Sequence, residues 1–270
     1  MSYTLIAENF DFGPYVPSIN NHGVVAFTVG SEVLCGDGGP LRRLLAGDFH
    51  SHPDINDNLQ CCVYGRRRVW GVAGDFERVG PLGPTMNESG QVAFRADGAI
   101  FLGERRLAAG AFEGLPVTNA AGTVVFRSDT GIYTTLGVVA DFTTFVSLGH
   151  FPDINDEGTV VFTGDHTVSG PGVFTSSRQV VAGFPSVRGA LINNAGQIVF
   201  YATPTGGSLG IYAQAGRLLS IGDSLWGARV TEFALNPVSF NDLGQLAIRI
   251  GLSNGRRMIV RRENLTPAET

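Results

Sequence analysis

Two short segments of the sequence each bring histidine close to aspartate. His50 and His52 precede Asp54, and His150 precedes Asp153. Alternate side chains of an extended segment point the same way, so His50 and His52 are expected on one side of the chain. Imidazole titrates near neutral pH, and a neighbouring carboxylate can fix its tautomer and raise its basicity. These residues are therefore candidates for general acid–base catalysis.

Two alternatives to that chemistry stay open at the level of the sequence. His50, His52 and His150 could hold a divalent metal ion, provided that the third ligand reaches across the space between the two segments. The structural alternative is that Asp54 and Asp153 only hydrogen-bond neighbouring strands while the histidines are exposed loop residues. The leading expectation is a site without a cofactor.

Both segments belong to an internal repeat that runs through the whole chain. Its unit reads Pro-x-Ile-Asn, two turn residues, Gly, then x-Val-x-Phe, as in residues 152–162. In one copy Leu59 replaces the glycine. The seven copies are marked by their asparagines, Asn20, Asn56, Asn87, Asn119, Asn155, Asn193 and Asn241.

Each copy continues with a second apolar run, such as Gly-Ile-Tyr at 131–133 and 210–212, and then with a third. With the segment before the asparagine, this makes four short strands joined by turns whose residues tolerate positive φ. Four antiparallel strands repeated seven times predict a seven-bladed β-propeller. A parallel β-helix is the alternative fold, but its coils are normally shorter.

The two ends of the chain predict how the ring closes. Residues 3–7 look like a fourth strand without its blade, and residues 258–261 look like a third strand without a fourth. Pairing them would complete the last blade and hide the exposed edges. We expect one propeller domain over residues 1–264 and a C-terminal tail over residues 265–270.

The sequence resembles bacterial propeller-repeat proteins built from tandem Ile-Asn-Asp-x-Gly-x-Val-x-Phe and Gly-Ile-Tyr units. The resemblance covers nearly the whole chain, and its motifs are structural turns and core strands. It implies the propeller fold and leaves the function open.

The connections between blades, where propellers usually bind ligands, supply further candidates. We expect them to share one end of the ring with the three histidines. The predicted substrate-binding residues are Tyr15, Arg78, Glu113, Phe145, His166, Arg188, Trp226, Arg229 and Glu232. The remaining hairpins are expected to gather arginines at the opposite end, most simply as a solvated rim and alternatively as a docking surface for an acidic protein. These arginines are Arg42–Arg43, Arg66–Arg68, Arg105–Arg106, Arg178 and Arg256–Arg257.

Composition narrows the partners. With 19 Lys+Arg against 24 Asp+Glu, the 270-residue chain has a formal charge of −5, which argues against binding to nucleic acid. No apolar run is long enough to span a membrane, and residues 1–10 lack the pattern of a signal peptide. We expect a cytoplasmic protein, or alternatively an exported one whose signal peptide has been removed.

The polar candidates occur in particular blades, whereas a lectin-type propeller tends to repeat its pocket in every blade. This favours one central site. The sequence therefore predicts an enzyme that acts on a small molecule in the central funnel, of lyase, isomerase, cyclase or hydrolase type. The alternative is a non-catalytic propeller that binds glycans or proteins.

Overall fold

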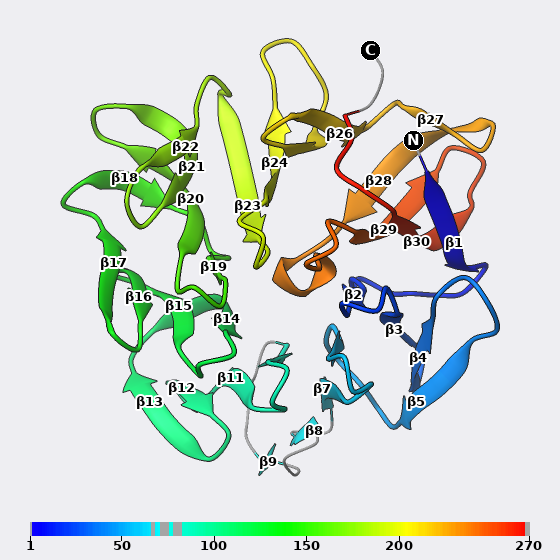
Figure 1. The fold of residues 1–270 in the computed structure, drawn as a ribbon, viewed down its shortest axis with the longest axis horizontal. Coiled ribbons are helices and arrows are strands. Elements are labelled where there is room, and N and C mark those ends of the chain that lie inside the picture. The colour runs from blue at the N-terminus through cyan, green and yellow to red at the C-terminus, as the bar shows by residue number, and fades with distance from the viewer. Residues whose placement is uncertain (1, 66–67, 71–75, 78–82, 268–270) are drawn as a thin grey trace.

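The computed structural model describes residues 2–65, 68–70, 76–77 and 83–267, which form seven antiparallel sheets around a ring (Figure 1). The first three blades are formed by β2 (Ser18–Ile19), β3 (Val25–Val29), β4 (Glu32–Gly36) and β5 (Arg42–Ala46); β6 (Asp54–Ile55), β7 (Cys61–Gly65), β8 (Arg68–Trp70) and β9 (Phe76–Glu77); and β10 (Thr85–Met86), β11 (Val92–Ala96), β12 (Ala99–Leu102) and β13 (Arg105–Ala109). The prediction of a seven-bladed propeller is confirmed.

The fourth to sixth blades follow the same order from the axis outward. They are formed by β14 (Phe112–Thr118), β15 (Val124–Ser128), β16 (Gly131–Thr134) and β17 (Gly137–Asp141); β18 (Phe145–Leu148), β19 (Asp153–Ile154), β20 (Val160–His166), β21 (Gly170–Thr175) and β22 (Gln179–Val181); and β23 (Ser186–Ile192), β24 (Ile198–Thr203), β25 (Gly210–Ala213) and β26 (Gly216–Ser220). In the fifth blade both β18 and β19 pair with β20, so its inner strand is interrupted.

The seventh blade joins both ends of the chain. It contains β27 (Ser224–Leu225), β28 (Ala228–Ala234), the 3₁₀ turn η1 (Pro237–Ser239), β29 (Leu246–Leu252), β30 (Arg257–Arg262) and β1 (Tyr3–Glu8). Strand β1 pairs antiparallel with β30, and Glu8 forms an ion pair with Arg256 at 2.6 Å. The predicted closure of the ring by the N-terminal strand is confirmed (Figure 1). No helix in the described part of the chain is long and apolar enough to cross a membrane.

The repeated asparagines link the blades at one end of the ring. Asn193 shows the pattern, since its Oδ1 accepts a hydrogen bond from the N–H of Gln197 at 2.9 Å and its Nδ2 donates to the carbonyl of Asn241 at 3.0 Å. Asn241 in turn donates to the carbonyl of Asn20, which closes the circle. Asn56 departs from the pattern by donating to the carbonyl of Glu88. Below, this end is called the asparagine-turn end.

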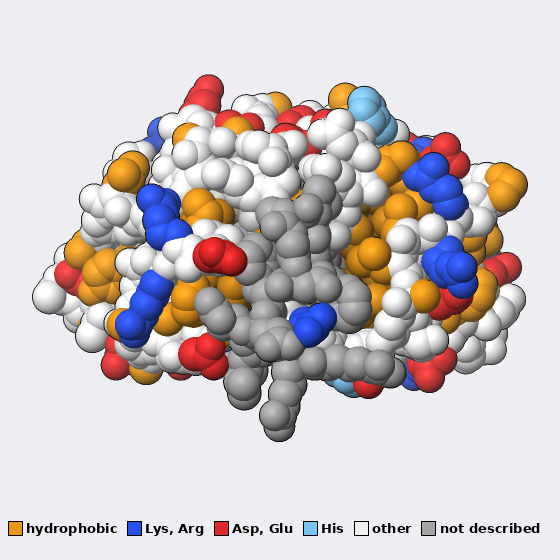
Figure 2. Space-filling model, turned by 90° about the horizontal axis from the view of Figure 1, so that it is seen from below, with side chains coloured by type: hydrophobic (Ala, Val, Ile, Leu, Met, Phe, Trp, Pro, Cys, Tyr) orange, Lys and Arg blue, Asp and Glu red, His pale blue; other side chains and the backbone are white. Residues whose placement is uncertain are grey.

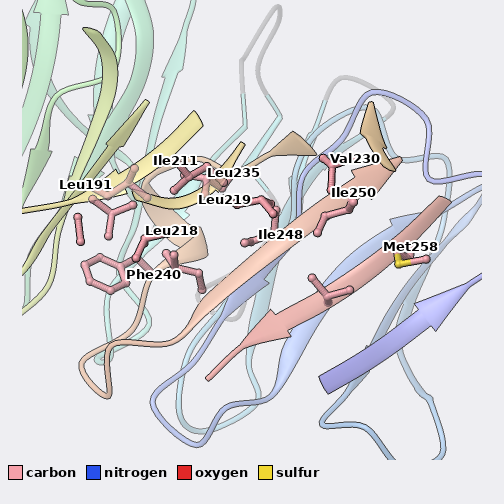
Figure 3. Close-up of a cluster of buried hydrophobic side chains, with 14 of the residues drawn as sticks. Leu191, Ile211, Leu218, Leu219, Val230, Leu235, Phe240, Ile248, Ile250 and Met258 are labelled. Carbon is pink, nitrogen blue, oxygen red and sulfur yellow. The ribbon is translucent and has the colours of Figure 1, made fainter. Parts of the chain in front are cut away.

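The core lies between neighbouring blades, because the inward-facing apolar residues of one sheet pack on those of the next. The largest cluster joins the sixth and seventh blades and includes Leu191, Ile211, Ile248 and Met258 (Figure 3). Since each blade repeats this contact on both sides, the ring is a continuous core around an axis.

The sequence predicted that the arginines of the hairpins gather at the end opposite the histidines, and the structure differs from this prediction. Arg68 pairs with Gly65, which forms a β-bridge with Phe49, and the N–H of His50 donates to Tyr64 at 2.7 Å. Arg68 therefore lies at the same end as His50, and Arg66 and Arg67 lie outside the described residues. Arg68 begins the third strand of its blade, next to the end of the second, whereas Arg42, Arg105 and Arg178 lie near the turns between third and fourth strands.

The seventh blade gives a second correction of the same kind. Arg257 lies 3.9 Å from Glu232, so these two residues share one end although they were expected at opposite ends. Figure 2 shows basic side chains spread over the height of the disc. The expectation of a single arginine-rich end is wrong.

Candidate functional site

A cavity of about 760 Å³ opens on the axis at the end opposite the asparagine turns. Its walls come from the segments that enter the first, second, fourth, fifth, sixth and seventh blades. Representative lining residues are Val16, His52, Leu115, His150, Arg188 and Leu235. It has apolar walls with a few polar side chains, as small-molecule sites usually have.

His52 enters this cavity as a neutral hydrogen-bond donor. Its Nδ1 accepts a hydrogen bond from the N–H of Val16 at 2.8 Å, so Nε2 holds the proton. Burial, assisted by the nearby Arg249 guanidinium, lowers the pKa of His52 to about 4. Tyr15 packs edge-on against the imidazole, with ring centroids 5.9 Å apart. His52 can thus donate to an oxygen of a ligand, but it does not gain a proton near neutral pH.

His150 is the exposed imidazole of the cavity. It lies in the interruption between β18 and β19, and its Nδ1 is 2.9 Å from Oε2 of Glu113, which belongs to the preceding blade. Gly114 makes this contact possible, because it has φ +68° and a Cβ there would lie 1.6 Å from the carbonyl oxygen of His150. The glycine therefore lets two connections approach closely enough to pair an imidazole with a carboxylate.

A buried arginine lies behind Glu113. The side chain of Arg127 is 6% exposed, and its Nη2 is 3.8 Å from Glu113 Oε2. Burial lowers the pKa of Arg127, and Glu113 opposes that effect. The guanidinium is also 5.1 Å from the ring centroid of Phe142. Arg127, Glu113 and His150 thus form a connected chain of side chains that ends at the cavity.

The sixth and seventh blades contribute an aromatic stack. Arg188 lies 5.5 Å from the ring centroid of Tyr201, and Tyr201 stacks on Phe233 at 5.9 Å and 11°. The Tyr201 hydroxyl donates to the carbonyl of Leu235 and accepts from its N–H. Burial raises the pKa of Tyr201 to about 12. All of these residues line the cavity.

Tyr201 was missed at the level of the sequence, although the repeat holds a signal for it. It directly follows the phenylalanine of its copy, and the same position is Thr28, Arg95 or Arg249 in other blades. In each case the side chain bonds a backbone carbonyl of the next blade: Thr28 that of Ser51, Arg95 that of Phe112, Tyr201 that of Leu235 and Arg249 that of Gly13. A polar residue of varying type in an otherwise apolar strand marks these contacts.

The other predicted histidines lie outside the cavity walls. His50 pairs with Asp48, with His50 Nε2 3.3 Å from Asp48 Oδ1. His166 stacks on Phe174, and its Nδ1 accepts from the N–H groups of Val168 and Ser169. Neither side chain lines the cavity, so His52 and His150 are the two histidines that the structure brings together there.

The remaining substrate-binding candidates are also distributed away from the axis. Phe145 is buried among core aromatic rings, and Trp226 touches Tyr3 edge-on at 6.3 Å on the seventh blade. Arg229 donates to the carbonyl of Gly222, while Glu232 pairs with Arg257 as described above. Arg78 lies outside the described residues.

Asp54 and Asp153 lie at the asparagine-turn end rather than beside the histidines. Both line a second cavity of about 140 Å³ there. Asp153 accepts from the N–H groups of Ile154 and Ile192, and Asp54 accepts from those of Ile55 and Met86. Burial raises the pKa of Asp54 to about 8 and that of Asp153 to about 7. Asp54 and Asp153 thus hold adjacent inner strands together, which is the alternative in which they only hydrogen-bond neighbouring strands.

Metal ligation by the three histidines finds no geometric support. Among the described residues, no group of three or more His, Cys, Asp or Glu side chains is arranged to hold a metal ion. His50 is engaged with Asp48 outside the cavity wall, and Nδ1 of His52 is occupied by a backbone N–H.

Comparison with known proteins identifies the fold. Neither a protein-family model nor a curated protein sequence matches the chain. Among solved structures, a chain of the mitotic checkpoint complex is similar with a TM-score of 0.52 and 11% identity, covering 97% of this chain and 91% of that one. The β-propeller domain of Cps50 (Swd1) from Myceliophteria thermophila is similar with a TM-score of 0.51 and 9% identity, covering 95% of this chain and 99% of that domain.

A larger protein is also similar. The extracellular domain of BT4673 from B. thetaiotaomicron has a TM-score of 0.45 and 10% identity, and this chain spans 41% of its length. The two structures with TM-scores above 0.5 are only about 10% identical to this chain, so they show the propeller fold alone.

Proposed function

We propose that this protein is an enzyme that performs non-redox acid–base chemistry on a small organic molecule in the axial cavity. The observation that supports the proposal is the contact of 2.9 Å between His150 and Glu113 at the wall of a 760 Å³ cavity. A binding site requires only a cavity. The wall of this cavity has, in addition, an imidazole that is oriented by a carboxylate. Such an imidazole can accept a proton and return it.

The direction of proton transfer follows from the pairing. Glu113 holds the proton of neutral His150 on Nδ1, which leaves Nε2 as the acceptor. After Nε2 removes a proton from a substrate carbon, hydroxyl or water, the imidazolium is stabilised by the same carboxylate. It can then return the proton from Nε2 to a leaving oxygen or to another carbon. This sequence serves lyase, isomerase, cyclase or hydrolase reactions without a change of oxidation state at the protein.

His52 has a different role in this proposal. Its imidazole is neutral with the proton on Nε2, so it would donate a hydrogen bond to a substrate oxygen and stabilise charge that develops there. Arg127 is a positioning residue, because it touches Glu113 and is buried behind it. The site thus combines one proton-transfer pair with one neutral donor.

An untargeted activity assay tests the proposal. The wild-type protein is incubated with a small-molecule extract, and mass spectrometry follows compounds that disappear and products that form. We expect an isomeric product, or one that differs by water, and a rate lower by about 10²- to 10⁴-fold for His150→Ala. Glu113→Gln should lower the same rate, since it removes the carboxylate that orients the imidazole.

His50→Ala is the matched control, because His50 is also paired with a carboxylate but lies outside the cavity wall. It should retain the wild-type rate, and both His50→Ala and His150→Ala should unfold within about 0.5 kcal/mol of wild type. If compounds of the extract bind the cavity and none of them is converted, the enzymatic proposal is overturned in favour of a binding propeller. Equal turnover by wild type and His150→Ala would exclude the named pair.

A further inference from the structure

One wall of the axial cavity holds an arginine without a carboxylate partner. Arg188 on β23 lines the cavity, and its guanidinium lies over the ring of Tyr201. No carboxylate of the described residues forms an ion pair with it, whereas Arg127, Arg217, Arg256 and Arg261 each have one. Stacking on an aromatic face fixes the plane of a guanidinium while leaving its N–H groups able to donate.

Positive charge continues along the same wall. Arg188 and Arg249 both lie near the Tyr201 hydroxyl, where their charges oppose the effect of burial on its pKa. Arg249 also lies near His52, whose pKa it lowers. Arg188, Tyr201, Arg249 and His52 therefore form an arc that runs from the sixth blade to the connection entering the second. Along this arc, the donors that line the cavity are the Arg188 guanidinium and the Nε2–H of His52.

The carboxylates of the cavity come from the fourth and fifth blades. Asp165 on β20 lines the cavity, and Glu113 is paired with His150. Strand β20 packs against β23, the strand of Arg188, but no ion pair joins Asp165 to Arg188 among the described residues. Much of the remaining lining is apolar, with Leu115, Leu148, Leu191 and Leu235. Because its guanidinium has no carboxylate paired with it, a negatively charged group is favoured next to Arg188.

We propose that the cavity binds a small organic acid, with its carboxylate at Arg188 and its apolar body against the leucines. This inference rests on the proposed function of the cavity and names the class of its substrate. A single stacked guanidinium suits one carboxylate, which it can bind in a bidentate manner. The acid would span the cavity, so that its other end lies toward His150.

Binding of two matched probes tests the inference. Benzoate and benzamide have nearly the same shape, but only benzoate has a negative charge. Saturation-transfer NMR and calorimetric titration with the wild-type protein should show benzoate binding at least about ten-fold tighter than benzamide, which corresponds to about 1.4 kcal/mol. Inorganic phosphate should bind more weakly than benzoate, because it gains nothing from the apolar lining.

Two variants locate the charged contact. Arg188→Gln should lower the affinity for benzoate by at least about ten-fold and leave that for benzamide unchanged, whereas Arg188→Lys should restore part of it. Arg229→Gln is the matched control, since Arg229 is an exposed arginine outside the cavity lining, and it should change neither affinity.

The outcomes separate the inference from the proposed function. If benzoate and benzamide bind the cavity equally well, the organic-acid inference is overturned while the cavity remains a small-molecule site. If Arg188→Gln binds benzoate as tightly as wild type does, the assignment of Arg188 is wrong. If His150→Ala loses turnover of an extract compound while both probes fail to bind, the acid–base proposal stands and the inference about the acid fails.

Discussion

The two ends of the propeller axis are built in different ways. At the asparagine-turn end, the same residue type recurs in every blade, and in six of the seven it bonds to the asparagine carbonyl of the next blade, as Asn193 and Asn241 do. At the cavity end, neighbouring blades contribute different residues, such as His52, His150 and Arg188. Repetition at one end closes the ring, and variation at the other end provides a single site.

If this division holds, substitutions at the asparagine-turn end should affect stability, and those at the cavity end should affect binding and turnover.

Asn193→Ala should lower the free energy of unfolding by about 2–4 kcal/mol. Asn193 is 4% exposed, and the substitution leaves the N–H of Gln197 and the carbonyl of Asn241 without partners. Each unpaired buried polar group costs about 1–3 kcal/mol. Urea denaturation followed by circular dichroism measures the change.

Two controls accompany that measurement. The neighbouring Asn194 is exposed, so Asn194→Ala should cost less than about 1 kcal/mol. Arg188→Gln, at the cavity end, should shift the midpoint of urea denaturation even less. Equal losses for Asn193→Ala and Arg188→Gln would break the comparison between the two ends.

The ring and its closure could be predicted from the sequence because they depend on residues that recur. The asparagine spacing gave the number of blades, and the unpaired strands at residues 3–7 and 258–261 gave the closure. The same regularity misled the interpretation of Asp54 and Asp153. They follow histidines in the chain, but each inner strand runs along the axis and carries them to the opposite end.

The pairing of His150 with Glu113 could not be predicted for a related reason. The two residues belong to successive blades, and their contact depends on the close approach at Gly114. Contacts between blades follow the geometry of the connections, which differ in length and sequence. Arg68 was assigned to the wrong end because the short second blade hides which of its hairpins this residue adjoins.

Stability should fall by about 2 kcal/mol between pH 5.5 and pH 8 through the buried Asp153. Its folded pKa is raised to about 7 by burial, against an unfolded value near 4. Between these values the folded state holds a proton that the unfolded state has lost, so stability is greatest at low pH and decreases until pH passes 7. Asp54, with a pKa raised to about 8, should add to the same trend.

Asp153→Asn separates this effect from others. The variant should lose about 1–3 kcal/mol at every pH, because one amide oxygen cannot replace two carboxylate oxygens that accept from Ile154 and Ile192. Its dependence on pH should also become shallower than that of wild type, whereas Asp156→Asn on the exposed rim should keep the wild-type slope. Stability that rises with pH would show that the two N–H donors outweigh burial.

The smallest expected effect comes from the outer rim of the asparagine-turn end. There the residue after the asparagine accepts a hydrogen bond from the preceding blade in six blades, as Asn194 Oδ1 accepts the N–H of Asp156 at 2.8 Å. The fourth blade has Ala120 at this position, so it offers no side-chain acceptor to Glu88 of the third blade. Ala120→Asn should supply that acceptor without adding charge beside Glu88 and Asp156.

We expect Ala120→Asn to raise the free energy of unfolding by about 0.5–1 kcal/mol, the usual net contribution of one hydrogen bond, and toward the lower value because the rim is exposed. Thermal unfolding should register a small increase in the midpoint, and Asn194→Ala should produce a decrease of similar size by removing the same kind of link.

Ala120→Ser controls for polarity, because its shorter side chain should not reach the N–H of Glu88. A gain of the same size with serine would mean that bridging to Glu88 is not the cause. A clear gain with asparagine alone would extend the repeated pattern to all seven blades, while the cavity end would still differ from blade to blade.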